Sequence, residues 1–105
     1  MGFKFGIQIA LFQNLVDLNL SSNNIEDISQ LDVLTLVQDL NLSCNKINKV
    51  SGLKGMLSTV KKINLSHNRI ASLQYFGEHI KNGQMAPNLF QLDFNDNYIG
   101  DIEQI

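Results

Sequence analysis

Tryptophan is absent from this sequence, and cysteine and proline occur once each among 105 residues. A single cysteine excludes an intramolecular disulfide, which small secreted domains often need, so an intracellular, reducing compartment is favoured. Apolar runs stay well short of the roughly 18 residues that a membrane-spanning helix needs. The 8 Lys and Arg against 10 Asp and Glu leave no basic surface for nucleic acid or an anionic membrane. Neither nucleic acid nor membrane is therefore expected as a direct partner.

The residues that are present favour a packed domain. Hydrophobic residues make up 44% of the chain and charged residues 17%, a balance that disordered segments lack. A chain of this length forms one domain, which we place over residues 1–105.

A repeated motif runs through most of the chain. Four segments follow the pattern L-x-x-L-x-L-x-x-N-x-I-x-x-I, with conservative replacements only. They read LVDLNLSSNNIEDI (15–28), VQDLNLSCNKINKV (37–50), VKKINLSHNRIASL (60–73) and LFQLDFNDNYIGDI (89–102). Their anchoring asparagines, Asn23, Asn45, Asn68 and Asn97, are 22, 23 and 29 residues apart. A period of this length indicates a solenoid of stacked units.

The spacing within one repeat predicts its local structure. Leu18 and Leu20 alternate with polar Asn19, as in a short strand that buries one face. Beyond the asparagine the apolar residues fall at every third position, at Ile25, Ile28, Leu31 and Leu34. That spacing is typical of a 3₁₀ or extended return segment with one inward side chain per turn.

The asparagine marks the point where the chain leaves the strand. Its side-chain amide can satisfy backbone groups that the reversal leaves unpaired. We therefore predict that Asn23, Asn45, Asn68 and Asn97 form a structural ladder along the solenoid.

These motifs resemble the leucine-rich repeat family, and in particular its 22-residue class typified by the phosphatase regulator Sds22. The resemblance implies an α/β solenoid that winds as a right-handed superhelix. Parallel strands would form a concave sheet, and 3₁₀ or irregular segments would form the convex side. Members of this Sds22-like class are mostly intracellular scaffolds, among them phosphatase regulators and centrosomal and ciliary proteins.

The motif divides the chain into repeats at 15–36, 37–59, 60–88 and 89–105. Residues 1–14 form an N-terminal cap or partial repeat. Counting back one period makes residues 1–12 the convex half of a repeat, whereas the alternation of Phe3, Phe5, Ile7 and Ile9 fits a capping strand. No polar cap follows Ile102, and solenoids need capped ends, so we expect a fragment of a longer chain.

An insertion lengthens the third repeat. Phe76 and Ile80 are four residues apart, and Asn82-Gly83 followed by Pro87 would end a helix. We expect a short helix on the convex side before the last repeat, packed by its own apolar face.

The polar strand positions should line the concave face because strand side chains alternate. We predict partner contacts at Asp17, Asn19, Asp39, Asn41, Lys62, Asn64, His67, Phe90, Gln91 and Asp93. Binding hot spots favour Trp, Tyr and Arg, and the set contains none of these. Phe90 is its one large aromatic side chain and so its one candidate anchor. The alternative is that these residues are only what such repeats carry.

One repeat position holds Ser22, Cys44, His67 and Asp96 in the four units. A cysteine, a histidine and an aspartate in line have the composition of a nucleophile, a base and an orienting group. An open sheet offers no oxyanion hole and no cavity that excludes water, and a zinc site wants more ligands. We therefore predict no catalytic, metal or cofactor site, and no enzymatic activity.

The sequence thus predicts a protein-protein interaction module, a scaffold or regulatory subunit, that binds a partner protein on its concave face. The alternative is a structural solenoid segment that packs end to end or self-associates through its uncapped C-terminal end, in a centrosomal, ciliary or phosphatase-regulatory assembly. We expect the cytoplasm as its location, with the nucleus, centrosome and cilium as alternatives.

Overall fold

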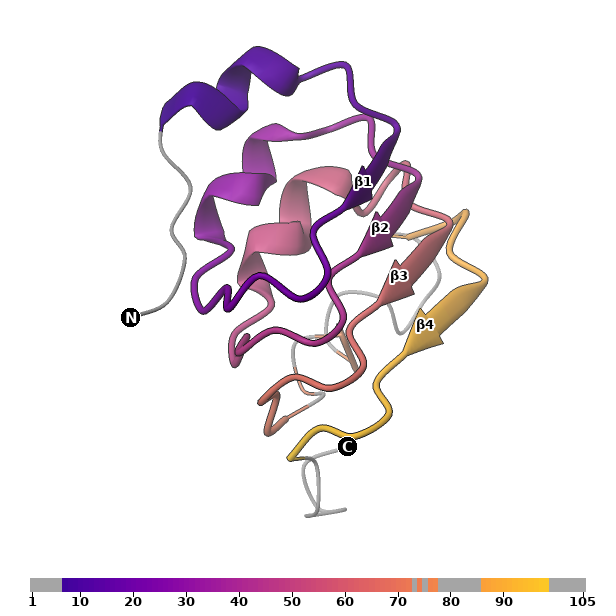
Figure 1. Cartoon of the computed structure of the whole chain (residues 1–105). Coiled ribbons are helices and arrows are strands. Elements are labelled where there is room, and N and C mark those ends of the chain that lie inside the picture. The colour runs from indigo at the N-terminus through magenta and orange to yellow at the C-terminus, as the bar shows by residue number, and fades with distance from the viewer. Residues whose placement is uncertain (1–6, 73, 75, 78–85, 99–105) are drawn as a thin grey trace.

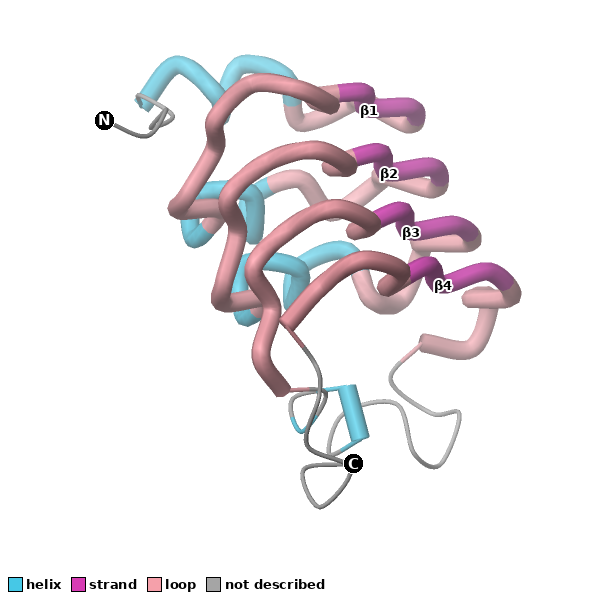
Figure 2. Tube along the Cα trace, turned by 60° about the horizontal axis from the view of Figure 1, so that its bottom comes forward, coloured by secondary structure: helices cyan, strands magenta, loops and turns pink. Residues whose placement is uncertain are grey.

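The computed structural model of the chain describes residues 7–72, 74, 76–77 and 86–98. Within them the chain winds through stacked coils, each placing a short strand on one side of the molecule (Figure 1, Figure 2). The elements are η1 (Ile7–Phe12), β1 (Asp17–Asn19), η2 (Ser29–Val33), β2 (Asp39–Asn41), η3 (Ser51–Met56), β3 (Lys62–Asn64) and β4 (Gln91–Asp93), where η denotes a 3₁₀ helix. The predicted order of strand and 3₁₀ return segment is confirmed in the first two repeats.

The strands form one parallel sheet in the order β1-β2-β3-β4. Residues at equivalent repeat positions pair across the sheet, in the rows Asp17–Asp39–Lys62–Gln91, Leu18–Leu40–Ile63–Leu92 and Asn19–Asn41–Asn64–Asp93. Because the register follows the repeat, every unit turns the middle residue of its strand toward the core. The predicted parallel sheet is confirmed.

The core lies between the sheet and the 3₁₀ helices, and it is one continuous cluster. Each described coil contributes apolar side chains to it, so no coil has a core of its own. In the two central strands Leu40 and Ile63 are at most 1% exposed. Leu18 and Leu92, in the outer strands, are only partly buried, because each has a neighbouring strand on one side alone.

The 3₁₀ helices η2 and η3 stack closely, an approach that the repeat motif does not predict. A Cβ atom added to Gly52 would lie 2.0 Å from the carbonyl oxygen of Ile28. One added to Gly55 would lie 1.8 Å from that of Asp32. Only glycine permits this approach, so these two positions set the distance between the first and second repeats.

The N-terminal end of the described chain is a 3₁₀ helix. Ile7 and Ile9 lie in the 3₁₀ helix η1, so the capping strand expected as one alternative does not form there. Two parts of the prediction lie outside the described residues. They are Phe3 and Phe5, and most of the helix expected around Phe76 to Ile80.

Phe76 itself is buried at 5% exposure. Its ring packs edge-on against Phe94 of the last repeat at 5.1 Å between centroids. This contact ties the insertion to the core.

Candidate partner-binding face

The strand face is the solvent-facing side of the sheet, formed by the outward residues of β1 to β4. It carries the predicted contact residues in two rows: Asp17, Asp39, Lys62 and Gln91 in the first, Asn19, Asn41, Asn64 and Asp93 in the second. The first row is exposed throughout, and the second is half-buried except at Asn19. The structure therefore brings eight of the predicted residues together on one surface.

The second row has a structural task. The Asn41 side-chain oxygen accepts hydrogen bonds from the backbone N–H of Ser43 at 3.0 Å and from its hydroxyl at 2.8 Å. Asn19 and Asn64 bind their own following serines in the same way. Asp93 accepts from the backbone N–H of Asn95. These side chains shape the end of each strand, and within the described chain the amide nitrogens of Asn19, Asn41 and Asn64 donate no hydrogen bond.

The ladder asparagines bridge neighbouring coils. The Asn45 side-chain oxygen accepts from the N–H groups of Asn23 and Ile25, at 2.9 and 3.0 Å. Its amide nitrogen donates to the carbonyl oxygens of Leu20 and Leu42. Each such asparagine thus joins its own turn to the turn of the preceding coil.

The other ladder positions follow this geometry to different degrees. Asn68 accepts from Ile47 N–H at 3.0 Å and Asn97 from Ile70 N–H at 2.9 Å. Asn23 is exposed, and among the described residues its amide donates to the carbonyl oxygen of Ser21 alone. Its equivalent partner one period earlier would be Phe3, which lies outside the described residues.

The column that holds Ser22, Cys44, His67 and Asp96 follows the strands. All four residues have a left-handed backbone, with φ between 57° and 59°. This conformation turns the chain toward the ladder asparagine and leaves each side chain exposed. The His67 Nε2 atom lies 3.3 Å from Asp96 Oδ2, and both side chains are more than half exposed.

The side chains of that column do not form a metal-binding group in the described chain. The thiol of Cys44 is free and exposed. Across the described ranges, no three His, Cys, Asp or Glu side chains lie close enough to hold a metal ion. His67, predicted as a partner contact, lies beyond the strand end rather than in the two rows.

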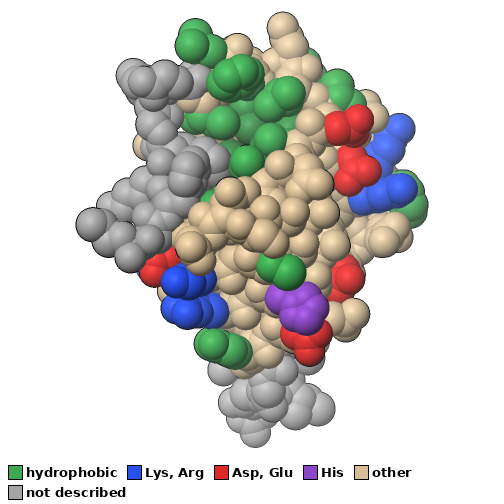
Figure 3. All heavy atoms as spheres, viewed as in Figure 1, with side chains coloured by type: hydrophobic (Ala, Val, Ile, Leu, Met, Phe, Trp, Pro, Cys, Tyr) green, Lys and Arg blue, Asp and Glu red, His purple; other side chains and the backbone are tan. Residues whose placement is uncertain are grey.

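Phe90 is the largest exposed feature beside the sheet, at 68% exposure. The Lys62 ammonium group lies over its ring, 5.8 Å from the centroid, which is within cation–π range. A hollow of about 160 Å³ opens next to them, called the Phe90 hollow; it is lined by Asp17, Gln38, Asp39, Lys61, Lys62 and Phe90. Acidic and basic side chains meet at this place on the surface (Figure 3).

A second hollow lies over the first two strands. The β1–β2 hollow has about 390 Å³ and is lined by Asp17, Leu18, Asn19, Asp39 and Asn41. It shares Asp17 and Asp39 with the Phe90 hollow, so the two form one continuous surface. Gln38 and Lys61 were not predicted as contacts, although both precede a strand in the position that Phe90 holds.

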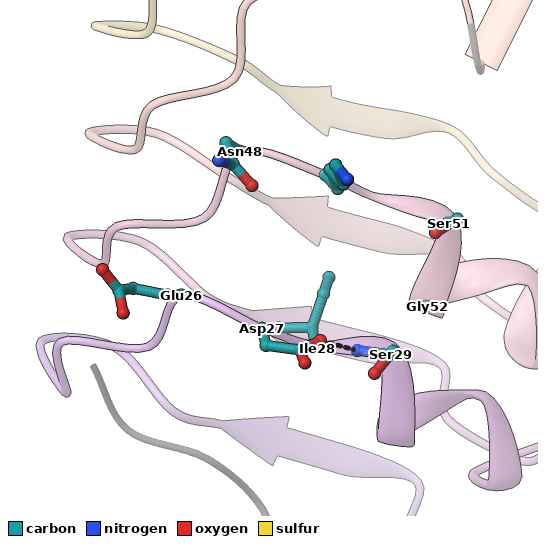
Figure 4. A pocket seen from close by; sticks show the side chains of 8 residues that line it. Glu26, Asp27, Ile28, Ser29, Asn48, Ser51 and Gly52 are labelled. Atoms are coloured by element: carbon teal, nitrogen blue, oxygen red, sulfur yellow. Dashed lines mark hydrogen bonds between the residues drawn. The ribbon is translucent and has the colours of Figure 1, made fainter. Parts of the chain in front are cut away.

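A third hollow lies away from the strand face, between the loops that lead into η2 and η3 (Figure 4). Its volume is about 450 Å³, and Glu26, Asp27, Asn48, Lys49 and Ser51 contribute polar groups. The Asp27 carboxylate accepts a hydrogen bond from Ser29 N–H at 2.8 Å at the start of η2. At least this part of the lining serves the local turn.

Comparison with known proteins identifies the fold. Residues 13–28 and 33–54 match the family model described as Leucine Rich repeat. Searched by sequence, the curated proteins contain no significant match.

Two internalins from Listeria monocytogenes are similar in structure. Internalin C2 superposes with a TM-score of 0.58 and 24% identity, over 91% of this chain and 49% of that one. Internalin F gives a TM-score of 0.68 and 23% identity, over 90% and 32%. The chain therefore shares the solenoid fold of these two proteins, and its match to leucine-rich repeats covers residues 13–28 and 33–54.

The chain spans half or less of the length of the two internalins. At these identities the likeness concerns the fold alone. The described residues contain no helix that is long and apolar enough to cross a membrane.

Proposed function

We propose that this chain is a non-enzymatic protein-interaction module, a scaffold or regulatory subunit, that binds a partner protein through its strand face. Proteins built from leucine-rich repeats are generally protein-interaction modules. The observation that carries the proposal is the exposed, structurally uncommitted first row of the strand face beside Phe90. A continuous core supports this row from behind, so its side chains are held in fixed register.

The contact residues differ in weight. Asp17, Asp39, Lys62 and Phe90 have polar or aromatic groups free to meet a partner. Asn19, Asn41 and Asn64 have half of their hydrogen-bonding capacity committed to the following serine. A partner therefore gains most from the first row and from Phe90, which combines apolar area with an adjacent charge.

Capture of a partner from cell lysate tests the proposal. Lys62→Glu and Phe90→Ala should each remove the captured protein, because both change the exposed anchor while leaving the core untouched. Lys54→Glu is the matched control, since Lys54 is exposed on η3, on the opposite side of the sheet. Urea melts should show that all variants fold alike. Equal capture by all three variants would refute binding through the strand face.

The class and the compartment are also proposals. We assign the chain to the Sds22-like class because its first two intervals are 22 and 23 residues. An intracellular location, in the cytoplasm first, agrees with one exposed, unpaired cysteine, Cys44. A fluorescent fusion that enters the secretory pathway would contradict this location.

Self-association is a second candidate, favoured by exposed apolar side chains at the N-terminal side of the sheet. Leu11, Phe12 and Val16 are 81%, 53% and 41% exposed. The C-terminal surface predicted to self-associate includes residues 99–105, which lie outside the described ranges. Sedimentation at increasing concentration tests this candidate: Leu11→Lys with Phe12→Lys should abolish any dimer, and a wild type that stays monomeric rules it out.

A further inference from the structure

The charges on the strand face are arranged by sign. Asp17 and Asp39 are direct register partners on β1 and β2, and both are exposed. Like charges in direct register repel each other, so this pair destabilises the sheet unless a cation lies near. The only ion pair found in the described chain joins His67 and Asp96. The two carboxylates therefore have no cationic partner there.

The nearest candidate cation is turned elsewhere. Lys62 is the register neighbour of Asp39, but its ammonium group lies over the Phe90 ring instead of forming an ion pair. Lys61 precedes it and lines the same hollow. The strand face thus has an acidic site on β1 and β2 and a basic site on β3, followed by an exposed aromatic ring before β4.

The spacing between strands sets which residues of an extended peptide would lie opposite these charges and the ring. Neighbouring strands lie ~4.8 Å apart, so the basic site is about 7 Å from the midpoint of the acidic pair, and Phe90 about 12 Å. An extended peptide crossing the strands advances ~3.3 Å per residue and points every second side chain to the same side. Its residues i, i+2 and i+4 therefore fall opposite the acidic pair, the lysines and Phe90 in turn.

We propose that the strand face binds an extended peptide segment of the partner with the alternating pattern basic–x–acidic–x–apolar, in either chain direction. The basic side chain lies between Asp17 and Asp39, where the two hollows join. The acidic side chain meets Lys61 and Lys62, and the apolar one covers Phe90. This inference rests on the proposed function, because it names the ligand of the same face.

Selection from a random peptide display library against the immobilised chain tests the pattern. Wild type should enrich peptides that combine a basic and an acidic residue two positions apart, with an apolar residue two positions further. The double variant Asp17→Asn/Asp39→Asn should lose the preference for the basic residue only. Lys61→Gln/Lys62→Gln should lose the preference for the acidic residue only.

A synthetic peptide taken from the selection gives the magnitude. Its Kd should rise at least about tenfold in either double variant, since a charged hydrogen-bonded contact is lost. Two control variants remove charges of the same sign outside the strand face: Asp32→Asn on η2 removes a carboxylate, and Lys54→Gln on η3 removes an ammonium group. Both should leave the Kd unchanged. Equal losses in the control variants would overturn the proposal.

The remaining outcomes separate this inference from the proposed function. Peptides that require Phe90 but show no charge pattern would overturn the inference and leave binding at the strand face intact. Peptides indifferent to Phe90→Ala and to both double variants would overturn both. A library that enriches no peptide would overturn the inference. The proposed function would then still be tested separately, by whether Lys62→Glu removes the protein captured from lysate.

Discussion

Asn45→Ala tests whether the ladder holds the coils together. The substitution removes the only acceptor that the described residues offer the Ile25 N–H, a buried group in a residue with 0% exposure. The carbonyl oxygen of Leu42 keeps a donor, because Asn68 also binds it at 2.9 Å. One fully buried donor is therefore left unpaired, which costs about 1–3 kcal/mol of unfolding free energy.

Urea denaturation followed by circular dichroism measures this cost. With an m value of about 1.5 kcal/mol/M, the midpoint should fall by about 1 M at unchanged m. Asn23→Ala is the matched control, because Asn23 is exposed and only its bond to Ser21 is lost, so its midpoint should move by less than about 0.3 M. Equal shifts in the two variants would refute the claim that stability comes from bridging between coils.

Three further predictions concern other positions. Gly55→Ala should destabilise by about 1–3 kcal/mol or more in the same urea assay, because its Cβ would overlap a backbone carbonyl, whereas Gly77→Ala, with nothing within 4 Å, should not destabilise. Cys44→Val should cost at least about 1 kcal/mol at its φ of 58°, and Cys44→Asn should cost nothing measurable; equal midpoints would contradict a conformational cause. The exposed pair of His67 and Asp96 should show a coupling energy below about 1 kcal/mol in a double-mutant cycle, decreasing in added salt, and a larger value would indicate a more protected contact.

The fold could be predicted from the sequence because the repeat fixes both spacing and burial. Alternation around Asn19 gives the strand, and the three-residue spacing from Ile25 to Leu34 gives the 3₁₀ return segment. The close stacking of η2 and η3 could not be predicted, because Gly52 and Gly55 stand at positions where the motif allows any residue. Only the distance between coils shows why a side chain is impossible there.

The shared face of the predicted contact residues follows from the sequence, but their hydrogen bonds and ring contacts do not. The outward strand residues follow from alternation alone, and the register confirms that they share one face. The local hydrogen bond from the Ser43 hydroxyl to Asn41 depends on the turn that follows the strand, so the pattern did not indicate that this asparagine is partly committed. The position of Lys62 over Phe90 depends on side-chain conformations that no spacing rule contains.

Differences among the four repeats identify the residues that are free to bind. The row that begins at Asn19 holds asparagine or aspartate in every unit, and each of these side chains supports its own turn. The row that begins at Asp17 changes from acidic to basic to neutral along the sheet, and in the described chain these side chains accept no hydrogen bond and form no ion pair. A repeat position whose residue varies without structural cost has no part in holding the coils. We therefore expect recognition by this solenoid to depend on the positions where its copies disagree, at Asp17, Asp39, Lys62 and Phe90, whereas stability depends on the positions where they agree.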